Sequence, residues 1–179
     1  MSAIEIEEIL SRKINMPEIK TVVAWASGNS GNLLRLWNFA CSDERRTSVN
    51  ALWTITHLPE TDSNWILSLR DDMIDMLLVE GDSGKKRLIL QILRELEYDK
   101  ENIRTDFLDY CMSKINSECE SYAVRCFSLY TAFKMCRHYP ELIAELENHL
   151  DMMSFQSLSP GLKSALRQTE SKIKKIKKR

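Results

Sequence analysis

Hydrophobic residues of this chain recur in three stretches that can be superposed, first at a step of 38 residues and then of 39. Each stretch carries apolar side chains at intervals of four residues, which places them on one face of a helix. The superposed positions are Trp65, Leu69, Met73 and Leu77, then Ile103, Phe107, Cys111 and Ile115, then Leu142, Leu146, Leu150 and Ser154, with Met153 beside the last. An internal period of this length is the signature of a helical repeat protein, in which each unit buries its apolar face against its neighbours.

A second set of apolar positions, upstream of the first in each stretch, superposes in the same way. Its members are Leu52, Ile55 and Leu58, then Leu90, Leu93 and Leu96, then Leu129, Ala132 and Met135. Serine and aspartate residues that can cap helices, and prolines that begin or end them, separate the two sets. The pattern predicts helix pairs over 43–58 with 63–79, 84–97 with 101–115, and 119–138 with 140–152. One more helix is expected over 160–177, and three upstream helices over 3–13, 17–27 and 31–41.

The domain organisation follows from these helix pairs. At 179 residues the chain is long enough for one domain with a sizeable core, so we expect a single domain over residues 1–179. Its two-helix repeats are predicted at 42–80, 81–118 and 119–156. Residues 1–41 fit the period poorly and are expected to form a degenerate N-terminal cap or repeat. Residues 157–179 are expected to form a C-terminal capping helix with a basic tail.

The amphipathic helix pairs resemble a known family of repeats. The stretches that carry the likeness are TSVNALWTITHLP (47–59), KKRLILQILREL (85–96) and YAVRCFSLYTAFKM (122–135), each followed by a second amphipathic helix. Over about residues 42–177 they are similar to HEAT or armadillo-type repeats, although the step is slightly shorter than the ~40–47 residues usual for HEAT. The resemblance implies an all-α fold, a short right-handed α-solenoid of two-helix repeats. A non-repeating helical bundle is the alternative.

Composition limits the classes of protein that need to be considered. Hydrophobic residues make up 44% and charged residues 28%, which is ordinary for a soluble globular protein. The sequence shows neither an apolar run of about 20 residues nor a signal-peptide pattern, so we expect a cytoplasmic protein without membrane contact. The five cysteines are an odd number without the short paired spacing of zinc sites, so reduced thiols are expected. We therefore predict no metal and no cofactor.

Sequence motifs of catalysis are missing as well. Residues 81–86 resemble a phosphate-binding loop superficially, but they follow a predicted helix rather than a strand and lack the required spacing. His57, His138 and His149 are scattered, and no nucleophile or carboxylate is placed in the sequence to orient any of these rings. The chain is therefore predicted not to be an enzyme.

Candidate binding residues come from the polar positions of the second helices. Three such columns align, namely Ser68, Asp106 and Glu145; Asp71, Asp109 and Asn148; and Asp72, Tyr110 and His149. Side chains at these offsets lie on one helix face, so stacked repeats would present an acidic stripe. The resemblance to HEAT proteins implies that second helices line the concave groove. The predicted partner-binding residues are Asp71, Asp72, Asp106, Asp109, Tyr110, Glu145 and His149. A charged face that only keeps the helices soluble is the alternative interpretation.

The predicted function is a non-enzymatic interaction or scaffold module that binds a protein or peptide, with a basic segment as the expected partner. An alternative arises because residues 163–179 carry eight basic side chains and one acidic one. That net charge of +7 leaves about −8 for the rest of the chain, since the whole chain carries −1. Basic residues are also expected on the exposed faces of the first helices, at Arg45, Arg46, Lys86, Arg87, Arg94 and Arg125. Together they support nucleic-acid binding as the alternative. The sequence does not indicate an oligomeric state.

Overall fold

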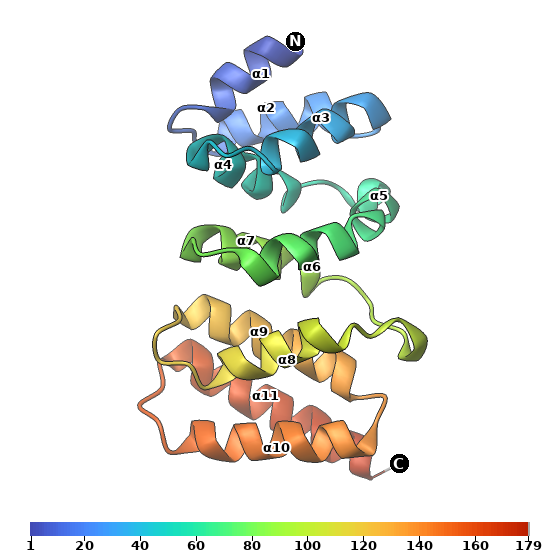
Figure 1. Cartoon of the computed structure of the whole chain (residues 1–179), viewed down its shortest axis with the longest axis vertical. Helices are drawn as coiled ribbons and strands as arrows, with labels where there is room; N and C mark the ends of the chain where they lie inside the picture. Colours follow the sequence, from blue (N-terminus) through green and yellow to red (C-terminus); the bar gives the residue numbers. More distant parts are fainter. Residues whose placement is uncertain (179) are drawn as a thin grey trace. The chain divides into compact units, whose positions relative to one another are not determined.

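The computed structural model describes residues 1–178, apart from the side chain of residue 102. Within this part the chain forms α-helices, two short 3-10 helices and turns, with no strand, so the predicted all-α class is confirmed. The helices are α1 (Ala3–Leu10), α2 (Met16–Ala26), α3 (Ser30–Ala40), α4 (Arg45–Ile55), η1 (Glu60–Asp62), α5 (Ser63–Ser68), α6 (Arg70–Val79), α7 (Ser83–Leu93), η2 (Lys100–Asn102), α8 (Thr105–Ile115), α9 (Tyr122–Cys136), α10 (Pro140–Ser154) and α11 (Pro160–Lys177) (Figure 1).

The chain divides into two compact units, unit 1 (Met1–Ile92) and unit 2 (Leu93–Arg179). In unit 1, α4 contacts α1, α2 and α3, so the N-terminal helices pack directly on the first helix of the first predicted repeat. In unit 2, α9 contacts α8, α10 and α11, and α10 contacts α8 and α11. The two central helices, α4 and α9, are therefore both first helices of predicted repeats.

The core is built from the apolar columns that the sequence predicts. The fully buried members include Met73 and Leu77 on α6, Phe107, Cys111 and Ile115 on α8, and Leu146 and Leu150 on α10. Met153 is 0% exposed and fills the position next to Ser154, whose side chain lies on the surface. The earlier members Trp65, Leu69, Ile103 and Leu142 are only half-buried. The period therefore predicts the buried face correctly for α6, α8 and α10 beyond their first turns.

The helix boundaries follow local capping chemistry. Asn15 and Glu18 form a reciprocal capping box at the start of α2, and Ser159 accepts a hydrogen bond from the Leu162 amide ahead of Pro160 in α11. The predicted helix over 63–79 is instead two helices, α5 and α6, which meet at Leu69. The Ser68 hydroxyl donates a 2.6 Å hydrogen bond to a backbone carbonyl in its own turn, a contact that competes with regular helix geometry.

Candidate functional site

Two of the predicted binding residues, Asp71 and Asp72, lie in unit 1. Both are exposed in the first turn of α6, where a negative charge interacts favourably with the helix dipole. The Asp71 carboxylate lies 3.3 Å from Nε of Arg70, so its charge is partly balanced by its neighbour. Asp72 has no ion-pair partner among the described residues and is the freer of the two charges.

The remaining predicted carboxylates lie in unit 2 on α8 and α10, two helices that contact each other. We call Asp106, Asp109 and Glu145 the acidic face. All three are exposed, but Asp106 is held by Arg104 through bonds of 2.6 and 3.1 Å, and the Arg104 guanidinium lowers the pKa of this carboxyl. Within the described chain, Asp109 and Glu145 form no ion pair. The acidic face therefore carries two uncompensated charges.

Tyr110 and His149, the two predicted contact residues that are not acidic, are half-buried and already engaged within unit 2. The Tyr110 ring lies 5.0 Å below the Lys114 ammonium group, in cation–π geometry. Nδ1 of His149 lies 3.3 Å from the Asn116 amide nitrogen, which also donates a 3.0 Å bond to the His149 carbonyl. Because Asn116 caps the C-terminal end of α8, this contact ties α8 to α10. These contacts indicate a structural role for both side chains.

Arg125 on α9 contradicts the prediction that it lies on an exposed basic face, because it is only 3% exposed. Its Nε donates a 2.9 Å hydrogen bond to the carbonyl of Ile115, the last residue of α8, and its terminal nitrogen donates to Oε1 of Gln156. The guanidinium therefore satisfies a carbonyl at a helix C-terminus, where a positive charge is favourable. The sequence did not indicate this contact, because spacing along α9 does not show that the Arg125 side chain reaches the end of α8.

A basic pocket that the sequence did not predict opens in unit 2 at the junction of α9, α11 and the segment after α7. Its volume is about 470 Å³. The basic and aromatic residues that line it are Arg94, Tyr130, Phe133, Lys134, Arg137 and Lys172. Arg94 lies 4.5 Å above the Phe127 ring, and Nζ of Lys172 lies 5.8 and 5.6 Å from the centroids of Tyr130 and Phe133. These cation–π contacts hold long side chains at the rim of the pocket.

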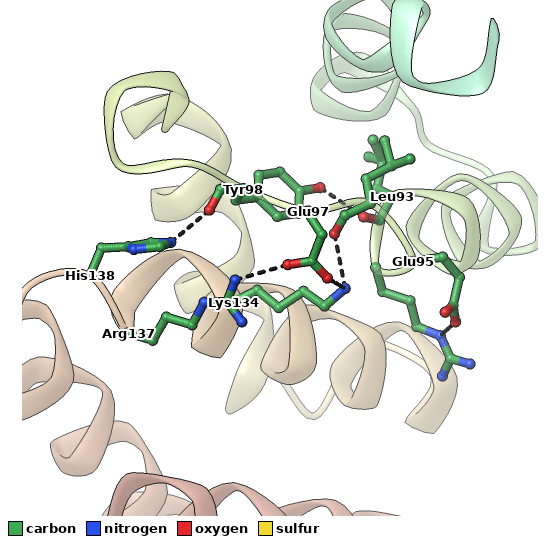
Figure 2. A network of polar contacts seen from close by, with 9 residues as sticks. Leu93, Glu95, Glu97, Tyr98, Lys134, Arg137 and His138 are labelled. Carbon is green, nitrogen blue, oxygen red and sulfur yellow. Dashed lines mark hydrogen bonds and ion pairs between the residues drawn. The ribbon is translucent and has the colours of Figure 1, made fainter. Parts of the chain in front are cut away.

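The segment 94–98 is bound to the last turn of α9 and the two residues that follow it by a polar network (Figure 2). Glu97 lies between two cations, 3.2 Å from Nζ of Lys134 and 2.8 Å from a terminal nitrogen of Arg137. Lys134 also donates a 2.9 Å bond to the Leu96 carbonyl, and Nε2 of His138 lies 2.6 Å from the Tyr98 carbonyl. The partners are 37–40 residues apart, close to the sequence period, so the network joins neighbouring repeats. The period was the one sequence signal that could have indicated these pairs.

The cysteines of the described chain differ in exposure, and its potential metal ligands are dispersed. No group of three His, Cys, Asp or Glu side chains within it is arranged to hold a metal ion. Cys41 and Cys119 are exposed free thiols, whereas Cys111 and Cys136 are buried, and burial raises the pKa of Cys136 to about 12. A thiol with a raised pKa stays protonated and is a poor nucleophile or metal ligand. Among residues 1–178, no helix combines the length and the apolar character needed to cross a bilayer.

Helix pairs with a shared apolar period, and polar contacts between neighbouring pairs, define an α-helical repeat protein. Comparison with known families agrees, because the family model described as HEAT repeat domain matches residues 6–173. The chain therefore belongs to the HEAT repeat domain family, which confirms the predicted resemblance and extends it upstream of residue 42. HEAT repeat domains commonly mediate interactions between proteins. No curated protein and no solved structure matches the chain significantly.

Proposed function

We propose that the protein is a non-enzymatic interaction module that binds a basic segment of a protein partner through the second helices of its repeats. The observation that carries the proposal is the pair of exposed, uncompensated carboxylates, Asp109 and Glu145, on two contacting helices. Arg104 balances the neighbouring Asp106, so these two charges are the ones available to a partner. In unit 1, Asp72 on the second helix α6 is the corresponding charge. Complementary charges accelerate encounter and select partners more than they increase affinity.

The geometry also favours binding over catalysis. A general acid needs a carboxyl group with a raised pKa, and Arg104 instead lowers the pKa of Asp106. Tyr110 and His149, the side chains that could act as a nucleophile or base, are half-buried and engaged with Lys114 and Asn116. These contacts position side chains for packing and are not aimed at a substrate.

The experiment measures binding of a degenerate Lys- and Arg-rich peptide library by fluorescence anisotropy, at about 50 and about 200 mM salt. We expect the full chain to bind the basic library more tightly than an acidic library, and more weakly at the higher salt concentration, where exposed charges are screened. The double variant Asp109→Lys/Glu145→Lys should bind the basic library at least about tenfold more weakly, since each exposed ion pair contributes up to about 1 kcal/mol and reversal adds repulsion.

The matched control is Glu101→Lys/Glu118→Lys, which changes the net charge by the same amount at two exposed positions outside α8 and α10. This control should retain the affinity of the parent chain within about twofold, because distant exposed charges are screened. Equal weakening in both double variants would show that only net charge matters, and the acidic face would then have no role as a binding surface.

A further inference from the structure

The basic pocket of unit 2 collects four cations from three separate segments of the chain. Arg94 follows α7, Lys134 and Arg137 lie in the last turn of α9 or just after it, and Lys172 lies on α11. Two carboxylates, Glu95 and Glu97, accompany them. Four cations and two carboxylates leave a net charge of +2, which would balance the charge of about −2 on a phosphate dianion.

Of the four pocket cations, Lys172 is the one that forms no ion pair with the described residues. Its ammonium group is instead held over the rings of Tyr130 and Phe133. An ammonium held by rings keeps its full charge and its N–H donors, because a ring face accepts no strong hydrogen bond. The pocket therefore contains an exposed, positioned donor that has no ion-pair partner among the described residues.

Glu97 indicates what kind of group the pocket can take. Lys134 and Arg137 already converge on its carboxylate at 3.2 and 2.8 Å, although the Glu97 side chain is 67% exposed. Burial raises the pKa of Glu97, but hydrogen bonds from Lys134 and Arg137 outweigh it and lower the pKa overall. The arrangement of these two donors thus suits an oxyanion, and the three oxygens of a phosphoryl group could use more of the available N–H donors than one carboxylate does.

We propose that the basic pocket binds a phosphorylated side chain of a protein partner. A volume of about 470 Å³ suits one such side chain and its flanking backbone, and clusters of Arg and Lys are the usual means of phosphopeptide recognition. A polynucleotide fits less well, because single strands bind by stacking bases on open aromatic faces. Here Lys172 lies over both rings, and Phe133 is only 8% exposed. The pocket is separate from the acidic face, so this inference is independent of the function proposed above.

The test measures binding of the full chain to three fluorescent probes: a degenerate peptide library with a fixed central phosphoserine, the same library with serine, and a single-stranded oligonucleotide. Lys172→Gln should weaken phosphopeptide binding about threefold to fivefold, the effect of one exposed charged contact. Glu97→Gln should strengthen it by a similar factor, because it removes the competing carboxylate. The control Lys163→Gln removes one exposed charge from α11 outside the pocket and should leave the affinity unchanged within about twofold.

The opposite signs of the two substitutions make the test specific. A preference for phosphoserine over serine, lowered by Lys172→Gln and raised by Glu97→Gln, supports the proposal. Equal binding of the two peptide libraries overturns it. Tighter binding of the oligonucleotide than of the phosphopeptides, with a steep dependence on salt, also overturns it and assigns the pocket to nucleic acid. Folding of each variant is checked by circular dichroism, and the Glu97→Gln result retains its meaning even if Lys172→Gln unfolds.

Discussion

Replacing Arg125 with alanine should destabilise unit 2, because this buried guanidinium binds the end of α8 and the segment after α10 to α9. It donates to the Ile115 carbonyl at 2.9 Å and to Oε1 of Gln156, and hydrogen bonds from a charged donor contribute about 1.5–3 kcal/mol each. Removing the buried charge also removes its desolvation cost, which offsets part of that loss. We therefore expect a net cost of about 3 kcal/mol.

The assay is urea unfolding followed by far-UV circular dichroism. With a slope of about 2.5 kcal/mol per molar urea, the expected loss lowers the unfolding midpoint by about 1.2 M. If the two units unfold in separate steps, the shift should occur in the step of unit 2. Arg125→Lys should fall between the parent and Arg125→Ala, because lysine keeps the charge but not the planar fork of donors.

The matched control for this substitution is Arg167→Ala, which removes an exposed arginine of α11 that has no ion-pair partner in the described part of the chain. Its unfolding free energy should stay within about 0.5 kcal/mol of the parent value. If Arg125→Ala shifts the midpoint no more than this control, the buried guanidinium does not hold the three segments together, and the reasoning is wrong.

Three further predictions concern the packing and the thiols of unit 2. Ile173 is 1% exposed and Ile176 is 36% exposed on the same helix. In the same urea assay, Ile173→Ala should lower the free energy of unfolding by about 3 kcal/mol and Ile176→Ala by less than about 1 kcal/mol. Equal losses would mean that α11 is not packed as described. N-ethylmaleimide at pH 8 should label Cys119 quickly but Cys111 and Cys136 only after unfolding, as peptide mass spectrometry would show. Because burial raises the pKa of Cys136 from its ordinary 9.0 to about 12, the unfolded thiol ionises first, and the stability that this thiol contributes should fall as pH rises from 9 toward 12. A Cys136→Ala variant should lose less stability over that range, and an equal loss would contradict this origin.

The location of the core could be predicted from the sequence because burial on a helix is a periodic property. Phe107 and Leu146 occupy corresponding positions in the period, and both are 0% exposed. In the last column Ser154 is on the surface and its neighbour Met153 is 0% exposed, since an adjacent side chain on a helix can cover the same space. The family assignment depended on the same regularity and is confirmed over residues 6–173. The repeat boundaries and the assignment of the acidic residues to a partner stay predictions.

The contacts of the candidate site residues were predicted less completely than the core. A long polar side chain can reach several neighbours, and the sequence does not show which of them it contacts. Asp106 and Asp109 look alike in the sequence, yet Arg104 binds one and leaves the other uncompensated. The ring of His149 lies against Asn116, a contact that the sequence did not indicate, and its predicted contact with a partner stays a prediction. The basic pocket was missed because its cations lie as far as 78 residues apart, from 94 to 172, and no local pattern connects them.

The sequence by itself determined the all-α class, the repeat period and most of the apolar positions that form the core, because these depend on which side of a helix is apolar. Only the tertiary structure decided which charges are compensated, because that depends on what lies within about 4 Å of each head group. Glu97 binds Lys134 and Arg137 across nearly one full period, and Lys172 reaches two rings of α9 from α11. Hydrophobic burial is read from spacing along one helix, whereas an ion pair or a pocket forms where separate helices meet.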